Sequence, residues 1–181
     1  MPSDQPTRCA VVLVGHGAPA TDCPQELVGE LMALEWRGDR APAEVPRLES
    51  RLEELDTAIR GWPRTPRNDP YKTGLERLAD TLRPLLPTDL LAVAYNEFCR
   101  PSIREAIEQA IGQGAGRVLV VPTMMTPGGV HSERDIPQAL QEVRRLHPEV
   151  VITYLWPFEL RQVAELLAAH VRSALEDRRQ R

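Results

Sequence analysis

The chain has 181 residues, of which 42% are hydrophobic, and a formal net charge of −4. This length is sufficient for one α/β domain with a substantial core. The acidic balance argues against a nucleic-acid-binding surface, which is usually basic. No apolar run reaches the ~20 residues of a membrane span, and the polar first residues lack a signal-peptide pattern. We therefore expect a cytoplasmic protein with neither nucleic-acid nor membrane partners.

Several common sites are missing from the sequence. Cys9, Cys23 and Cys99 are far apart and form no CxxC pair, which argues against a zinc knuckle and a disulfide framework and favours free thiols. No phosphate-binding loop, dinucleotide fingerprint or GxSxG motif occurs, which argues against nucleotide chemistry and serine hydrolysis. We expect no organic cofactor.

An apolar run at 9–15 predicts the first buried strand. About seventy residues separate it from the next apolar run, more than a single crossover helix needs. Leucine spacing there predicts three helices, at about 24–37, 46–60 and 71–86, with a proline-rich linker at 61–70. We expect the third helix to pack on the sheet. The first two are open to three interpretations: a lid, an association surface or a decorative insertion.

Strands and helices alternate in the rest of the chain. Apolar runs predict strands at 89–96, 117–122 and 149–157, and helical periodicity predicts helices beginning at Pro101, at Asp135 and at about residue 159. Pro101 suits a first helical turn, and Asp135 with Gln138 matches a capping box. The alternation predicts right-handed βαβ crossovers and a doubly wound, flavodoxin-like parallel sheet. We therefore predict a single α/β domain over residues 1–181, with a helical insertion at about 20–70.

Three predicted strand ends carry a side chain that can bind a metal. His16 follows the first strand between two glycines, Glu97 follows the second, and His131 lies in a long loop with Gly128 and Gly129 after the third. Ligands of open parallel sheets bind outside the carboxyl ends of the strands. Each residue alone also fits a plain role in a turn or near a helix start. Together they form a His₂Glu set, which binds a divalent metal and leaves coordination positions open.

The stretches VVLVGHGAP, AYNEFCRPSIREAI and VPTMMTPGGVHSERDIP, which contain these residues, resemble the class II tetrapyrrole metal chelatases, specifically the sirohydrochlorin cobaltochelatases and ferrochelatases. The resemblance implies a lyase-type enzyme of cobalamin or siroheme biosynthesis. Such an enzyme inserts a divalent metal, Co²⁺ or Fe²⁺ with Ni²⁺ as a further candidate, into sirohydrochlorin or a related macrocycle. The metal is then a substrate. The resemblance also implies that a chain with one lobe forms a homodimer.

The resemblance further implies that His16 and His131 are metal ligands and proton acceptors, and that Glu97 is a third ligand or a proton carrier. Metallation removes two pyrrole protons, and imidazoles, with an ordinary pKa near ~6.5, can hold an ion and take protons at neutral pH. The chain departs from the family pattern at Ala18-Pro19 and in WPFELRQ, which leaves the macrocycle's identity open.

An acidic tetrapyrrole also needs cationic anchors. The candidates, each of which also fits an ordinary surface charge, are Arg64, Arg67, Lys72, Arg100 and Arg134. Two other functions remain open: a non-catalytic tetrapyrrole or metal carrier and, less favoured, a metal-dependent hydrolase.

Overall fold

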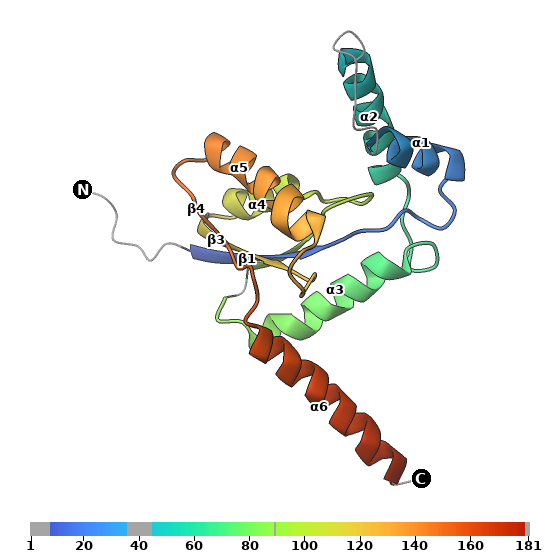
Figure 1. Ribbon diagram of the computed structural model, residues 1–181. Helices are drawn as coiled ribbons and strands as arrows, with labels where there is room; N and C mark the ends of the chain where they lie inside the picture. The colour runs from blue at the N-terminus through green and yellow to red at the C-terminus, as the bar shows by residue number, and fades with distance from the viewer. Residues whose placement is uncertain (1–7, 36–44, 89, 180–181) are drawn as a thin grey trace, which may run out of the picture.

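The computed structural model describes residues 8–35, 45–88 and 90–179. They contain one fully parallel sheet with the strand order β2-β1-β3-β4 (Figure 1). The strands are β1 (Arg8–Gly15), β2 (Leu90–Tyr95), β3 (Ala115–Pro122) and β4 (Val151–Tyr154). The predicted α/β fold is confirmed. The fourth strand is shorter than the predicted 149–157, and position 89 lies outside the described residues.

Helices cover both faces of the sheet. They are α3 (Pro70–Leu82), followed by the 3₁₀ turn Arg83–Leu85, on one face, and α4 (Ile103–Gly112) and α5 (Ile136–Leu146) on the other. The central strand β1 alternates between the two cores. Val12 and Val14 pack in the α4–α5 core, and Val11 and Leu13 pack in the α3 core. Burial on both faces explains why β1 is a continuous apolar run.

The predicted starts of α4 and α5 are wrong in detail. Helix α4 begins at Ile103 and not at Pro101, and its N-cap is Ser102, which forms a capping box with Glu105. Asp135 does not cap α5, because it already has a helical backbone at the end of a π-helical turn, His131–Asp135. Its carboxylate instead accepts hydrogen bonds from nearby side chains of that turn.

The first two insertion helices form a small core of their own. In α1 (Gln25–Glu35) and α2 (Val45–Arg60), Leu31, Leu55 and Ile59 are almost fully buried and pack with Phe98, which follows β2. Figure 1 shows the pair beyond the carboxyl end of β1. The predicted end of the first helix, at 36–37, lies outside the described residues. The three cysteines are free thiols, as predicted.

The last predicted helix forms as α6 (Leu160–Arg179). Figure 1 shows α6 leaving the sheet on the side of α3 and running away from it. Its leucines and Val171 are more than half exposed, for example Leu167 at 60%, whereas Val163 is partly buried. Within the described ranges, no helix has the length and apolar character needed to cross a membrane.

The linker between α2 and α3 is organised around a buried arginine. Arg64 forms an ion pair with Asp69 at 2.7 Å, and both side chains are at most 9% exposed. The same guanidinium donates hydrogen bonds to the carbonyl oxygens of Ala18, Ile59 and Phe98. Arg64 therefore connects the linker to the loop after β1, to the end of α2 and to the loop after β2. The interpretation of Arg64 as a cationic anchor at the surface is therefore wrong, because its side chain is buried.

We predict that Arg64→Ala lowers the free energy of unfolding by about 3–5 kcal/mol, because it leaves the Asp69 carboxylate buried and unpaired. Urea denaturation measures this change. Arg67→Ala, in the same linker but exposed, is the matched control and should change stability by less than about 0.5 kcal/mol. Equal effects of the two substitutions would contradict the structural role of Arg64.

Candidate functional site

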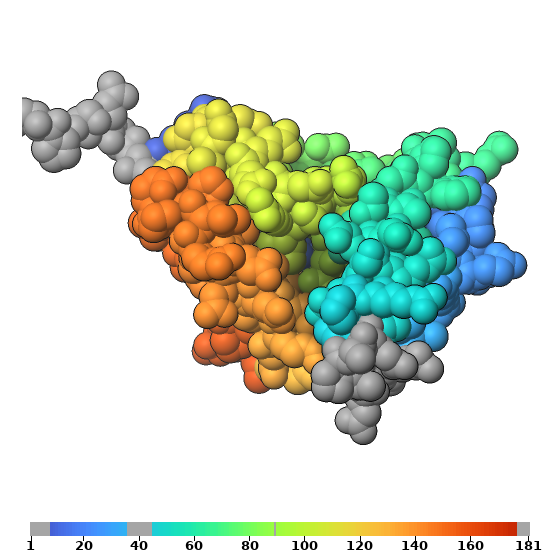
Figure 2. All heavy atoms as spheres, turned by 90° about the horizontal axis from the view of Figure 1, so that it is seen from above, coloured from blue at the N-terminus to red at the C-terminus, as the bar shows by residue number. Residues whose placement is uncertain are grey.

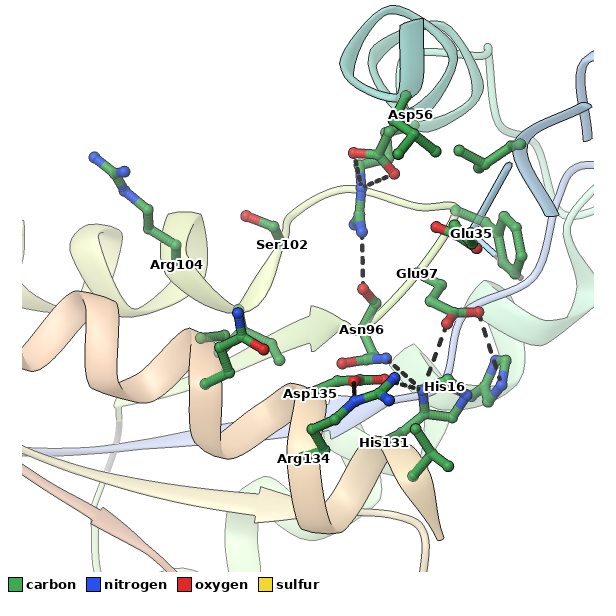
Figure 3. A pocket seen from close by; sticks show the side chains of 18 of the residues that line it. His16, Glu35, Asp56, Asn96, Glu97, Ser102, Arg104, His131, Arg134 and Asp135 are labelled. Atoms are coloured by element: carbon green, nitrogen blue, oxygen red, sulfur yellow. Dashed lines mark hydrogen bonds and ion pairs between the residues drawn. The ribbon is translucent and has the colours of Figure 1, made fainter. Parts of the chain in front are cut away.

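The fold brings together the three residues predicted as a metal-binding set. His16, Glu97 and His131 follow β1, β2 and β3, and one potential ligand atom from each lies within 4.8 Å of the others. Glu97 lies between the histidines, with Oε2 4.0 Å from His16 Nε2 and Oε1 3.4 Å from His131 Nδ1. Figure 3 shows this arrangement, in which the two imidazole rings meet edge to face at 4.5 Å.

The loops that carry His16 and Glu97 are joined through their backbones. The Glu97 amide donates a hydrogen bond to the His16 carbonyl, and the Asn96 amide donates to that of Gly15, each at 2.9 Å. Gly17 has a φ of +96°, and a Cβ at this position would overlap the Glu97 carbonyl oxygen. Only glycine tolerates both conditions, so the second glycine of the GHG sequence is needed for this close approach.

The orientation of His16 leaves one ring nitrogen for a ligand. Its backbone amide donates a 2.8 Å hydrogen bond to the Tyr71 hydroxyl of α3. Its ring Nδ1 lies 2.8 Å from the Gly17 carbonyl oxygen. Because a carbonyl only accepts hydrogen bonds, Nδ1 carries the proton in the neutral ring. The lone pair therefore lies on Nε2, which faces Glu97.

His131 is oriented in a similar way by a carboxylate. Its Nδ1 lies 2.7 Å from Asp135 Oδ2 and 2.9 Å from the Asn96 side-chain amide. Desolvation raises the pKa of Asp135, but hydrogen bonds from Arg134 and His131 outweigh it and lower that pKa overall. An ionised Asp135 accepts a hydrogen bond from His131 Nδ1–H, so that the lone pair of the neutral ring lies on Nε2. Carboxylates behind ligating histidines commonly have this role.

The loop that carries Glu97 is held by the insertion. Arg60, at the end of α2, donates hydrogen bonds to the carbonyl oxygens of Asn96 at 2.8 Å and Cys99 at 2.9 Å, and pairs with Asp56. Between those carbonyls, Phe98 has a φ of +59°, a conformation that costs energy in a residue other than glycine. The insertion therefore supports the backbone on both sides of Phe98.

A cleft of about 1090 Å³ opens over the three residues. Figure 2 shows it as a hollow between the orange atoms of α5 and the teal atoms of α2. Its lining includes Leu31 and Met32 from α1, together with Phe98. The volume slightly exceeds the roughly 300–1,000 Å³ that is usual for ligand sites. The cleft is therefore large enough for a sizeable, partly apolar ligand.

The charged side chains of the cleft differ from those predicted. Of the predicted anchors only Arg134 lines it, and Arg104, which sequence reasoning missed, lies near its mouth. Lys72 pairs instead with Glu76, and Arg100 with Glu105. Glu35 of α1 is a further acid of the lining, and desolvation together with the Glu97 and Asp56 charges raises its pKa.

Comparisons with known proteins identify a family and several relatives of this chain. The CbiX family model matches residues 66–174. A sirohydrochlorin cobaltochelatase of Priestia megaterium is 32% identical over 89 residues, which cover 49% of this chain and 29% of the relative. Another, from Methanocaldococcus jannaschii, is 35% identical over 79 residues, covering 43% and 54%. The chain thus spans roughly half or less of the length of these relatives.

A crystal structure shares the fold. It is that of a CbiX protein of cobalamin biosynthesis from Marinobacter aquaeolei VT8, with a TM-score of 0.55 and 19% identity, covering 93% of this chain and 98% of that one. At this identity the likeness concerns the fold alone. The family model, however, matches more than half of the present sequence, and its range includes Glu97 and His131. The chain therefore belongs to the CbiX family.

Proposed function

We propose that this protein inserts a divalent metal, Co²⁺ or Fe²⁺, into sirohydrochlorin or a closely related acidic tetrapyrrole. The observation that carries the proposal is the convergence of His16, Glu97 and His131 at the floor of a large cleft. The names of the family relatives support the same chemistry. The metal is a substrate that the three side chains hold before it passes to the macrocycle.

Three protein ligands suit an ion that must be handed on. Two imidazole nitrogens and one carboxylate oxygen bind a borderline divalent cation and leave positions that macrocycle nitrogens can fill. Charge is conserved in the exchange, since the macrocycle loses two N–H protons as it gains one dication. As the ion leaves, the freed Nε2 atoms and the Glu97 carboxylate become the bases nearest to those protons.

The cleft also offers contacts for an acidic, flat ligand. Arg104 and Arg134 lie at its sides with side chains 55% and 72% exposed, so their guanidinium groups can turn toward a bound carboxylate. Arg104 now pairs with Glu108, and Arg134 pairs with Asp135. Bidentate pairing with a substrate carboxylate would compete with these two ion pairs. The apolar side chains of α1 and Phe98 can contact the ring face.

The proposal extends to the organisation of the whole chain. Residues 1–181 act as one domain, in which the insertion at about 20–70 forms one wall of the cleft. The contacts of Arg60 with the loop after β2 support this role for the insertion. The cytoplasmic location and the homodimer remain proposals that rest on the sequence and on the family resemblance.

We predict that Asp135→Asn weakens Co²⁺ binding by about 10- to 100-fold, because the amide no longer fixes the His131 tautomer as a carboxylate does. Isothermal titration at neutral pH measures the dissociation constant. His131→Ala should weaken binding further. His147→Ala, which removes a histidine paired with Glu108 and Glu149, is the control and should have no effect. Unchanged affinity in His131→Ala would rule out the proposed ligand set.

We predict that the wild-type protein accelerates anaerobic Co²⁺ insertion into sirohydrochlorin and that Glu97→Gln slows it by at least about 100-fold. The change in absorbance of the macrocycle measures the rate.

Arg104→Ala should raise the KM for sirohydrochlorin and leave Co²⁺ affinity unchanged, because Arg104 contacts no metal-binding residue. Arg161→Ala, on the distant helix α6, is its control. Tight macrocycle binding without any metallation would instead indicate a carrier.

A further inference from the structure

One carboxylate of the cleft is shared between a candidate metal ligand and an arginine. Asp135 Oδ2 lies 2.7 Å from His131 Nδ1, and Asp135 Oδ1 accepts a 2.9 Å hydrogen bond from Arg134 Nε. Figure 3 shows both side chains beside this carboxylate. Because the charge of Asp135 is divided between a cation and an imidazole, a change in the position of Arg134 alters the charge that acts on His131.

The two contacts of Asp135 differ in how firmly they are held. The side chains of His131 and Asp135 are 26% and 27% exposed, whereas that of Arg134 is 72% exposed. Exposed ion pairs contribute little to stability, because water screens both charges and a long side chain loses freedom in the pair. Arg134 is therefore the partner that can leave Asp135 while His131 stays in place.

Arg134 also has donors available for a second carboxylate. It lines the cleft, and within the described part of the chain only its Nε bonds to Asp135, which leaves both terminal nitrogens. These two nitrogens form a fork that can pair bidentately with a carboxylate. A ligand carboxylate on the fork neutralises the guanidinium and competes with Asp135 for it. An acidic ligand therefore changes the surroundings of His131 without touching this residue.

We propose that Arg134 makes strong metal binding conditional on the macrocycle, an inference that rests on the proposed function. While Arg134 pairs with Asp135, the charge available to His131 is reduced, and the site holds Co²⁺ less tightly. A macrocycle carboxylate that draws Arg134 away leaves Asp135 to His131 alone. A carboxylate behind a ligating imidazole strengthens the imidazole as a metal ligand, so the affinity for Co²⁺ rises.

The coupling has a consequence for the order of events in the cleft. A macrocycle that raises the affinity for the metal must itself bind more tightly when the metal is present, because coupling between two sites is reciprocal. The two substrates therefore assemble on the protein together, and the empty cleft retains little metal. Arg134 acts on the metal through Asp135 and His131, so with respect to the metal it is a positioning residue.

Isothermal titration with Co²⁺ alone tests the effect of Arg134, at about pH 7.5, where imidazoles of ordinary pKa are mostly neutral. We expect Arg134→Ala to lower the dissociation constant by about 5-fold or more. Arg134→Lys keeps a cation and should stay close to the wild type. Arg145→Ala, which removes an exposed charge from the last turn of α5, is the control and should have no effect. Unchanged or weaker binding in Arg134→Ala overturns the proposal.

A double-mutant cycle shows whether Arg134 acts through Asp135. In an Asp135→Asn chain, adding Arg134→Ala should leave the dissociation constant for Co²⁺ unchanged within about 2-fold, because the carboxylate that links the two side chains is gone. An equal gain in affinity in both backgrounds would show that the charge of Arg134 acts directly on the metal, and would overturn the proposed role of Asp135.

Fluorescence titration with metal-free sirohydrochlorin tests whether the macrocycle binds Arg134. Arg134→Ala should weaken macrocycle binding by about 10-fold, as expected for the loss of a hydrogen bond between charged groups. The substitution then shifts the two affinities in opposite directions, which a general loss of structure would not do. Wild-type binding of both substrates without these shifts overturns the inference and leaves the proposed function standing. A wild type that binds neither substrate overturns both.

Discussion

The geometry of the candidate site depends on how the loop at 96–99 is held. Its chain direction reverses around Phe98, whose φ of +59° is unfavourable for a side chain of this size. Arg60 and Arg64, at the end of α2 and in the linker that follows, donate hydrogen bonds to three carbonyl oxygens of this loop, those of Asn96, Phe98 and Cys99. Charge-assisted hydrogen bonds of this kind are stronger than neutral ones, and here they hold the backbone that presents Glu97.

The same contacts give the insertion a role in the site. From sequence alone, the helices now seen as α1 and α2 could be a lid, an association surface or decoration. Arg60 of α2 supports the loop after β2, and Leu31 and Leu52 form part of the cleft wall. The insertion therefore combines positioning of a ligand-bearing loop with enclosure of the cleft. At the carboxyl ends of β1 and β2, the backbone hydrogen bonds from Asn96 to Gly15 and from Glu97 to His16 also hold the two loops together.

The strands and the convergence of the three candidate metal ligands could be predicted because their signals are local. β1 is apolar throughout since both faces are buried, and three strand ends of a parallel sheet point to one edge, which placed His16, Glu97 and His131 near one another. Asp135 was misassigned as a helix cap. Its spacing of four residues from His131 was the available signal, because residues at i and i+4 are neighbours on a helical turn.

Other features had no local signal. The carbonyls of the loop after β2 that Arg60 and Arg64 bind are more than thirty residues away in the chain, so no pattern around either arginine reveals these contacts. Arg104 looks like any exposed helix residue until the cleft is seen beside it. The amphipathic period of α6 predicted a helix but not the exposure of its leucines, because periodicity describes one element and packing requires two.

The most direct test of the central claim is a crystal soaked with Co²⁺ and measured on both sides of the cobalt absorption edge. The account predicts one strong anomalous peak between the His16 and His131 imidazoles, within ligand distance of the Glu97 carboxylate and next to open space in the cleft. A cobalt peak elsewhere with none at this position, at full loading and neutral pH, would contradict the account.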